Sequence, residues 1–345
     1  MTITLDEVAT KTSAYLAAKW KCQVDVTNIT KIFGGASRET YRLEVAVDGQ
    51  SRGLILRRDP PTSLIDTERK LEYGAYAAIY PTDIPVPEPL FLENDTSILQ
   101  QPFSIMAAVD DAVTDVSTLN EAQKRLIGRE KWQLLGTLAM KDPVELGFDR
   151  FMEIPELDQC AARELAYWEK IIMEDEIHPQ PIAHAAIRWL KNNLPQQAQK
   201  LSVVHGDYRS GNFLFDPDDG IRAVLDWEMC HLGDPFEDLA WSLDPLWSWA
   251  EPENAGGLLP PDEAISIWEE SSGLTVDPEV FKWWQVFASV KGLAIWISSS
   301  EDFQNGEGKD SILAMAGWLM TDRQNQILLN YLSPHAGGQW KGGLA

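Results

Sequence analysis

The stretch Val203 to Phe215 decides the fold, and it reads Val-Val-His-Gly-Asp-Tyr-Arg-Ser-Gly-Asn-Phe-Leu-Phe. After a turn at residues 216–220 the chain continues Ile-Arg-Ala-Val-Leu-Asp-Trp-Glu, ending at Glu228. Two apolar segments flank a polar loop, and the turn predicts that the second segment returns beside the first as a hairpin. The surrounding sequence has mostly helical periodicity. We therefore expect the chemistry on the loop of this β-rich island.

Three polar residues of the island suit phosphoryl transfer. Asp207 lies on the loop, five residues before Asn212, and Asp226 ends the returning strand. The hairpin is expected to bring Asn212 close to Asp226, and such a pair of oxygen ligands suits Mg²⁺. Phosphoryl transfer needs one carboxylate to orient the attacking hydroxyl and further oxygen ligands for metal ions. The protein kinase signature has the same spacing.

The interpretation has an ordinary alternative. Asp207 is then a turn-forming residue and Asn212 caps a strand. His205 is expected to hold the loop by a hydrogen bond rather than to act as a base. Glu228 either adds to the metal site or is a solvated neighbour.

The island and the residues after it resemble the aminoglycoside phosphotransferase-like (APH/choline kinase-type) family. The motifs are His205 to Asn212, Leu225-Asp226-Trp227-Glu228, Leu232-Gly233-Asp234-Pro235 and Asp238-Leu239-Ala240-Trp241. The resemblance runs over roughly residues 25 to 330 and favours the branch that includes kinase-like domains fused to some acyl-CoA dehydrogenases.

This resemblance implies a protein-kinase-like α+β fold and an ATP- and Mg²⁺-dependent small-molecule kinase. Asp207 is then the catalytic base, and Asn212 and Asp226 are the metal ligands. Asp234 is expected to start a turn, and Asp238 to open a helix that braces the catalytic loop.

The periodicity of the chain agrees with two lobes. Before about residue 110 the pattern is α+β, and long helical patterns dominate afterwards, which predicts a nucleotide-binding lobe at residues 1–108 and a helical lobe with the acceptor site at 109–345. Helices are expected at 5–20 and 64–79, and strands of a small antiparallel sheet at 24–32, 40–47, 53–58, 89–92 and 98–108. The later helices are expected at 122–140, 160–174, 182–193, 260–270, 280–298 and 311–332.

A glycine-containing turn is the expected phosphate-covering loop. It lies between two predicted strands, and its glycines allow close approach of backbone N–H groups to phosphate oxygens. By itself a Gly-Gly turn is a weak signal, and its position in the family pattern supports the prediction. The residues expected to bind nucleotide here are Gly34, Gly35, Ser37 and Arg38.

Arg57 takes the strand position at which kinase-like folds place a lysine. Arginine keeps the charge but has a different, bidentate geometry. Its expected partner is a helical glutamate, Glu72 or Glu68, and Glu72 matches the family better. The alternative is that Arg57 is a surface charge at a strand edge. The resemblance places the adenine-binding hinge at Met106 to Val109.

Composition excludes several kinds of partner. The formal net charge of −24 argues against nucleic acid, which requires clustered lysine and arginine, and against an anionic membrane surface. The most apolar stretch, 286–297, is interrupted by Lys291 and is too short to span a bilayer. Three widely spaced cysteines suit a reducing cytosol, so a cytoplasmic protein is expected.

The acceptor is predicted to be a small molecule with a hydroxyl group. Its site is expected among the helices after residue 240, and the tryptophan candidates are each expected to be core residues first. These candidates are Trp241, Trp247, Trp249, Trp283 and Trp284. Two rival functions are a nucleotide-binding module without catalysis and a protein kinase. The intact Asp-Asn-Asp set opposes the first, and the short connection from Asp226 to Gly233 opposes the second.

Overall fold

The computed structural model describes residues 3–32, 38–59, 66–248, 251–306 and 311–333. The chain divides into two compact units, one comprising residues 1–113 with 213–228, and the other 114–212 with 229–345. The first unit ends close to the boundary predicted after residue 108, and the hairpin of the β-rich island groups with it.

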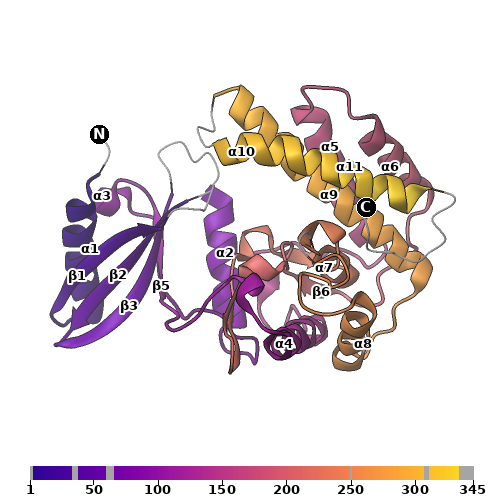
Figure 1. Ribbon diagram of the computed structural model, residues 1–345. Coiled ribbons are helices and arrows are strands. Elements are labelled where there is room, and N and C mark those ends of the chain that lie inside the picture. The colour runs from indigo at the N-terminus through magenta and orange to yellow at the C-terminus, as the bar shows by residue number, and fades with distance from the viewer. Residues whose placement is uncertain (1–2, 33–37, 60–65, 249–250, 307–310, 334–345) are drawn as a thin grey trace. The chain divides into compact units, whose positions relative to one another are not determined.

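The first unit contains an antiparallel five-stranded sheet with strand order β1-β2-β3-β5-β4. Strands β1, β2, β3 and β5 are labelled in Figure 1. The tight turn between β2 and β3 uses Asp48 and Gly49, both with positive φ, as a two-residue hairpin turn requires. The strands are β1 (Val24–Ile32), β2 (Glu39–Val47), β3 (Gln50–Arg58), β4 (Pro89–Glu93) and β5 (Phe103–Ala107).

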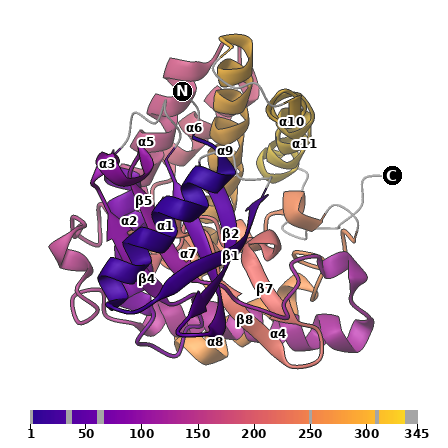
Figure 2. The same ribbon diagram turned by 90° about the vertical axis from the view of Figure 1, so that its left-hand side faces the viewer.

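Helix α1 (Leu5–Trp20) packs against this sheet (Figure 2). Its first turn is closed by a capping box, in which the side chains of Thr4 and Glu7 satisfy backbone N–H groups. Val8 and Leu16 are fully buried in the core that the strands share. Helix α2 (Asp66–Ile79) contacts β4.

One predicted strand is shorter than expected. The expected strand at 98–108 is instead the short helix α3 (Thr96–Leu99) followed by β5. The Asp95 side chain accepts a hydrogen bond from the Ser97 N–H and starts the helical turn, which Gln100 ends with a φ of 66°. A local cap thus overrides the apolar pattern that suggested extended chain.

The second unit is built around α9 (Pro278–Gln304), which packs against α5, α6, α7 and α11 (Figure 1). Its expected burial on nearly all sides is confirmed between Val286 and Ala294. Among the described residues, no helix is long and apolar enough to cross a membrane. The other helices are α4 (Glu121–Met140), α5 (Cys160–Asp175), α6 (Pro181–Asn192), α7 (Phe236–Ser242), α8 (Pro261–Ser272), α10 (Ser311–Met315) and α11 (Thr321–Leu332).

The helix expected at 311–332 is not uniform. A π-helical segment, Ala316–Met320, separates α10 from α11. Gly317 lies at this point, and a Cβ there would be 2.1 Å from the Ser300 hydroxyl, so the close approach to α9 requires glycine. The apolar periodicity predicted the helical region but not the extra residue in its turn.

The β-rich island contributes to both units. In the first, β7 (Phe213–Asp216) and β8 (Gly220–Val224) form the predicted hairpin. In the second, β6 (Ser202–Val204) pairs antiparallel with β9 (His231–Gly233), a strand that the sequence did not predict. Residues 205–212, the loop that carries Asp207, follow β6 directly.

Candidate active site

The backbone before Asp207 has a conformation that only glycine tolerates well. Gly206 has a φ of 86°, and a Cβ at this position would lie 2.4 Å from the Met229 carbonyl oxygen. The loop therefore turns sharply after β6, which directs Asp207 away from the strand. The glycine of the His-Gly-Asp motif is explained by this close contact.

Asp238 binds the same turn from α7. Its Oδ2 accepts a hydrogen bond from the His205 N–H at 2.6 Å, and its Oδ1 accepts one from the Gly206 N–H at 2.9 Å. The Asp207 N–H in turn donates to His205 Nδ1 at 3.1 Å. The bracing role expected of Asp238 and the hydrogen-bonding role expected of His205 are confirmed.

The Asp207 carboxylate is surrounded by donors. Trp241 Nε1 donates to Oδ1 at 2.9 Å, while Asn212 Nδ2 and Arg209 Nε donate to Oδ2 at 2.7 and 3.1 Å. All three partners are donors, and they hold both oxygens of the carboxylate in place. The side chain remains 16% exposed. The second unit therefore presents a fixed, accessible carboxylate, and it brings Asp207 and Asn212 together.

A buried lysine supports the other end of the loop. Lys131 of α4 donates to the Ser210 hydroxyl at 3.2 Å, and its carbonyl accepts a hydrogen bond from the Tyr208 hydroxyl at 2.8 Å. Burial, helped by the nearby Arg209 charge, lowers the pKa of Lys131 to about 7. The sequence analysis did not identify Lys131, which reads there as an ordinary charge in an amphipathic helix.

In the first unit, Arg57 forms the expected ion pair with Glu72. It lies on β3, an interior strand, and its side chain is only 17% exposed, so the alternative of a strand-edge surface charge is wrong. Arg38 also pairs with Glu72 and lies 3.5 Å from Asp59. Arg58 points to the other face, where it pairs with Glu39. The nucleotide roles of Arg57, Arg38 and Glu72 stay predictions.

The backbone and the carboxylate of Asp226 are both held in an uncommon way. Its φ is 68°, in the left-handed region, and its backbone N–H donates to the Tyr76 hydroxyl at 2.8 Å. Its Oδ1 is buried without a hydrogen-bond partner among the described residues, although Arg57 Nη2 lies 3.8 Å away. A buried carboxylate oxygen without a hydrogen bond suits a cation ligand.

The Asn212 side chain also has an oxygen that suits a magnesium ligand. Its amide nitrogen is used by Asp207, which leaves the amide oxygen as the atom available to a cation. Asn212 belongs to the second unit and Asp226 to the first, and their shared metal site stays a prediction.

The remaining predicted nucleotide-binding positions either belong to β5 and its end or lie outside the described residues. Met106 is buried within β5, paired to β3 and β4, and Val109 follows the strand end; their adenine contact stays a prediction. Gly34, Gly35, Ser37 and Trp249, and the side chain of Glu68, lie outside the described part of the chain.

The tryptophan candidates separate into two groups. Trp283 and Trp284 are core residues, packed edge-to-face with Phe287 or stacked on it. Trp241 is also buried, but its indole nitrogen donates to Asp207. Trp247 is partly exposed and packs edge-on against the Trp241 ring, with 5.1 Å between the ring centroids. Trp241 therefore contacts the Asp207 carboxylate directly, and Trp247 contacts Trp241 and Arg209.

Comparisons with known proteins agree with this geometry. Acyl-CoA dehydrogenase family member 11 of Rattus norvegicus is 28% identical over 308 residues, covering 84% of this chain. The chain spans only 38% of that relative's length. This relative is of the kind that the sequence resemblance named.

Solved structures share the fold. A protein of Ralstonia eutropha JMP134, described as a candidate aminoglycoside phosphotransferase, superposes with a TM-score of 0.74 at 21% identity, covering 93% of this chain and 97% of its own. A thermostable aminoglycoside phosphotransferase in complex with AMP-PNP and hygromycin B gives 0.59 at 15% identity, covering 93% and 98%. The fold is therefore the predicted kinase-like α+β fold, with an antiparallel-sheet N-terminal region and a helical C-terminal region.

The model of the phosphotransferase enzyme family matches residues 28–260, a span that includes most of the sheet, the loop that carries Asp207, and the β7–β8 hairpin. With Asp207 fixed beside Asn212 at the position that the family pattern predicts, the chain belongs to the phosphotransferase enzyme family.

Proposed function

We propose that this chain transfers the γ-phosphate of ATP to a hydroxyl group of a small molecule in a Mg²⁺-dependent reaction. The observation that carries the proposal is the Asp207 carboxylate, held by three side-chain donors and still accessible. Family membership supports phosphoryl transfer, and one structural neighbour holds the ATP analogue AMP-PNP.

Asp207 is the proton acceptor in this proposal. Its carboxylate orients the acceptor hydroxyl toward the γ-phosphate and takes up the hydroxyl proton, while the new oxygen–phosphorus bond forms and the bond from the γ-phosphorus to the departing ADP breaks. The hydrogen bonds from Trp241 and Asn212 hold one oxygen each, so the carboxylate reaches the reacting geometry without rearrangement. Arg209 adds a positive charge beside the same carboxylate.

Asn212 and Asp226 are the residues that would hold Mg²⁺. When bound, the ion offsets the negative charge of the phosphate groups. The amide oxygen of Asn212 and the unsatisfied Oδ1 of Asp226 supply the oxygen ligands that this ion prefers.

Arg57 is proposed to pair with nucleotide phosphates. Glu72 fixes its guanidinium by an ion pair, as the helical glutamate does for the lysine of protein kinases. The remaining proposed nucleotide contacts are Gly34, Gly35, Ser37, Arg38 and the backbone from Met106 to Val109.

Asp207→Asn tests the proposal. The amide keeps the size of the side chain but is a poor proton acceptor, so kcat should fall by about 10²- to 10⁴-fold. Mg-ATP affinity, measured by calorimetry, should change less than twofold. Turnover is followed as ADP release with a panel of simple alcohols, amino sugars and hydroxyacyl-CoA compounds.

Asp219→Asn is the matched control, because Asp219 is an exposed carboxylate on the turn between β7 and β8. It should leave turnover unchanged. A wild-type rate in Asp207→Asn would refute the assignment of the base. Nucleotide binding without turnover of any acceptor in the wild type would instead favour a binding module.

A further inference from the structure

Lys291 of α9 is a buried cation whose ammonium group contacts the catalytic loop. The residue is 1% exposed, and its Nζ lies 2.6 Å from the Gly206 carbonyl oxygen and 2.8 Å from Glu237 Oε1. Burying an ammonium group is costly unless it is paired and hydrogen-bonded. Here Glu237 supplies the opposite charge, and the Gly206 carbonyl of the loop accepts a hydrogen bond.

The contacted carbonyl belongs to the peptide bond that joins Gly206 to Asp207. The N–H of that same peptide donates to His205 Nδ1. Both polar groups of this peptide unit are therefore held by side chains, the oxygen by Lys291 and the nitrogen by His205. Because rotating this peptide plane would move the Asp207 side chain, the two bonds fix its direction.

Lys291 also reaches Asp207 by a second route. Its Nζ lies 5.1 Å from the centroid of the Trp241 ring, within the range of a cation–π contact. The indole nitrogen of Trp241 donates to Asp207 Oδ1. The backbone and the carboxylate of Asp207 thus each depend on a group that Lys291 contacts.

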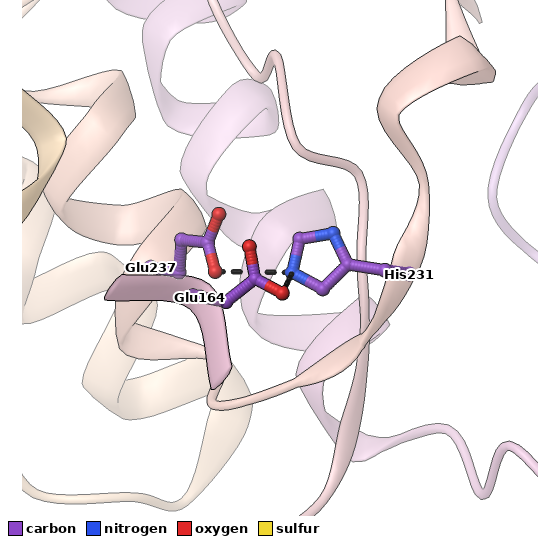
Figure 3. Close-up of side chains that lie close together, drawn as sticks. All are labelled: Glu164, His231 and Glu237. Atoms are coloured by element: carbon purple, nitrogen blue, oxygen red, sulfur yellow. Dashed lines mark hydrogen bonds and ion pairs between the residues drawn. The ribbon is translucent and has the colours of Figure 1, made fainter. Parts of the chain in front are cut away.

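Glu237, the charged partner of Lys291, belongs to a cluster with His231 and Glu164 (Figure 3). His231 Nε2 lies 3.0 Å from Glu237 Oε2 and 3.6 Å from Glu164 Oε1, and its Nδ1 lies 3.0 Å from the Met229 carbonyl oxygen. Both ring nitrogens face acceptors, the arrangement of a protonated imidazolium. Burial alone would favour the neutral ring, but Glu164 and Glu237 raise the pKa of His231 to about 10.

The polar groups of this cluster pair with one another without a metal ion. Glu164, His231 and Glu237 bring ligand atoms within 4.8 Å of one another, a spacing that a cation could use. Lys291 and protonated His231 already oppose the two carboxylates, and a proton occupies the ring nitrogen that a metal would need. The cluster is better explained as a hydrogen-bonded support for Lys291.

We propose that Lys291 is a positioning residue, which fixes the Gly206–Asp207 peptide and thereby aims the catalytic carboxylate. The inference rests on the proposed function, because it assigns Lys291 a role in that reaction. It does not place Lys291 in contact with substrate.

The test compares Lys291→Met with the double variant Lys291→Met/Glu237→Gln. The single variant removes the ammonium group but leaves an unbalanced carboxylate, so it should lose stability as well as activity. The double variant removes one charge of each sign, leaves His231 opposed by Glu164, and should regain much of the thermal stability. Its kcat should nevertheless stay about 10- to 100-fold below wild type, with the KM for Mg-ATP within twofold.

Amide hydrogen exchange of the segment 203–212 gives a readout that does not need turnover. Exchange should be faster in the double variant than in the wild type, because the Gly206 carbonyl has lost its donor. Lys282→Met, an exposed lysine on the same helix, is the control and should change neither exchange nor kcat.

The possible results separate the two proposals. A double variant with wild-type kcat and wild-type exchange would overturn the role of Lys291. If the wild type turns over no acceptor, the proposed function fails, and faster exchange in the double variant still supports the positioning of the peptide.

Discussion

At the scale of single residues, Asp207 and Asp226 are held in contrasting ways. The Asp207 oxygens are occupied by Trp241, Asn212 and Arg209, whereas Asp226 keeps a buried oxygen without a hydrogen bond in the described structure. Strained backbone at a non-glycine residue, such as the φ of 68° at Asp226, recurs at functional sites. The first arrangement suits a proton acceptor, and the second suits a ligand for a cation.

Lys131 makes a pH-dependent contribution to stability. Burial lowers the pKa of Lys131 to about 7 in the folded chain, from an ordinary value of 10.5. Below pH 7, Lys131 is protonated in both the folded and the unfolded state, and the folded state bears the full free-energy cost of burying its ammonium group. Between pH 7 and 10.5 the unfolded state binds more protons, so the contribution of Lys131 to stability rises with pH. The free energy of unfolding of wild type minus that of Lys131→Met should therefore rise by a few kcal/mol, on the order expected for such a shift.

Urea unfolding of both proteins at pH 6.5, 8 and 9.5 measures this difference. Titration of the other groups is common to both and cancels. A difference that stays constant over this range would show that Lys131 does not change protonation on folding.

At the scale of elements, two helices hold the catalytic loop from different sides. Helix α7 supplies Asp238, which accepts hydrogen bonds from two backbone N–H groups, and α9 supplies Lys291, which donates to a carbonyl. The loop itself has a glycine with positive φ and gains little from its own secondary structure. Its geometry therefore depends on these helices.

Asp238→Asn tests the contribution of α7. The amide can accept from only one of the two N–H groups and places its own NH₂ against the other, so about 1 to 3 kcal/mol of stability should be lost. We expect kcat to fall at least tenfold at temperatures where the variant is folded. Asp262→Asn, in the exposed first turn of α8, is the control for loss of an acidic helix residue. Chemical denaturation measures the free energy of unfolding of both variants. Equal values for Asp238→Asn and Asp262→Asn would contradict the bracing role of Asp238.

Elements with regular periodicity were predictable from the sequence, and those set by single contacts were not. The bounds of α1 and β1 follow from alternation and helical spacing, as does the β7–β8 hairpin. Helix α3 depends on one Asp95 cap, and the π segment at Ala316–Met320 depends on packing against Ser300. Such contacts join residues whose relation the pattern does not contain.

At the scale of the whole molecule, the same division holds for the site. Asp207, Asn212 and Asp226 fall in one short stretch, so their spacing predicts a phosphoryl-transfer motif. The supports Lys131 and Lys291 come from helices about 80 residues away in sequence from the loop atoms they bind. In sequence, Lys291 reads only as an interruption of an apolar helix, and its role requires the tertiary structure.

The net charge of −24 also acts at this scale. In the proposed reaction, ATP has to bind to a chain that repels anions on average, so cationic side chains are needed near its phosphates. Arg57 and Arg38 in the first unit and Arg209 in the second are the described candidates.

The most direct measurement is a crystal structure with AMP-PNP and Mn²⁺, located by its anomalous scattering. We predict that Asn212 Oδ1 and an Asp226 carboxylate oxygen bind the ion, with Asp207 facing the γ-phosphate. An ion bound away from Asn212 and Asp226, or Asp207 turned from the phosphate, would contradict it.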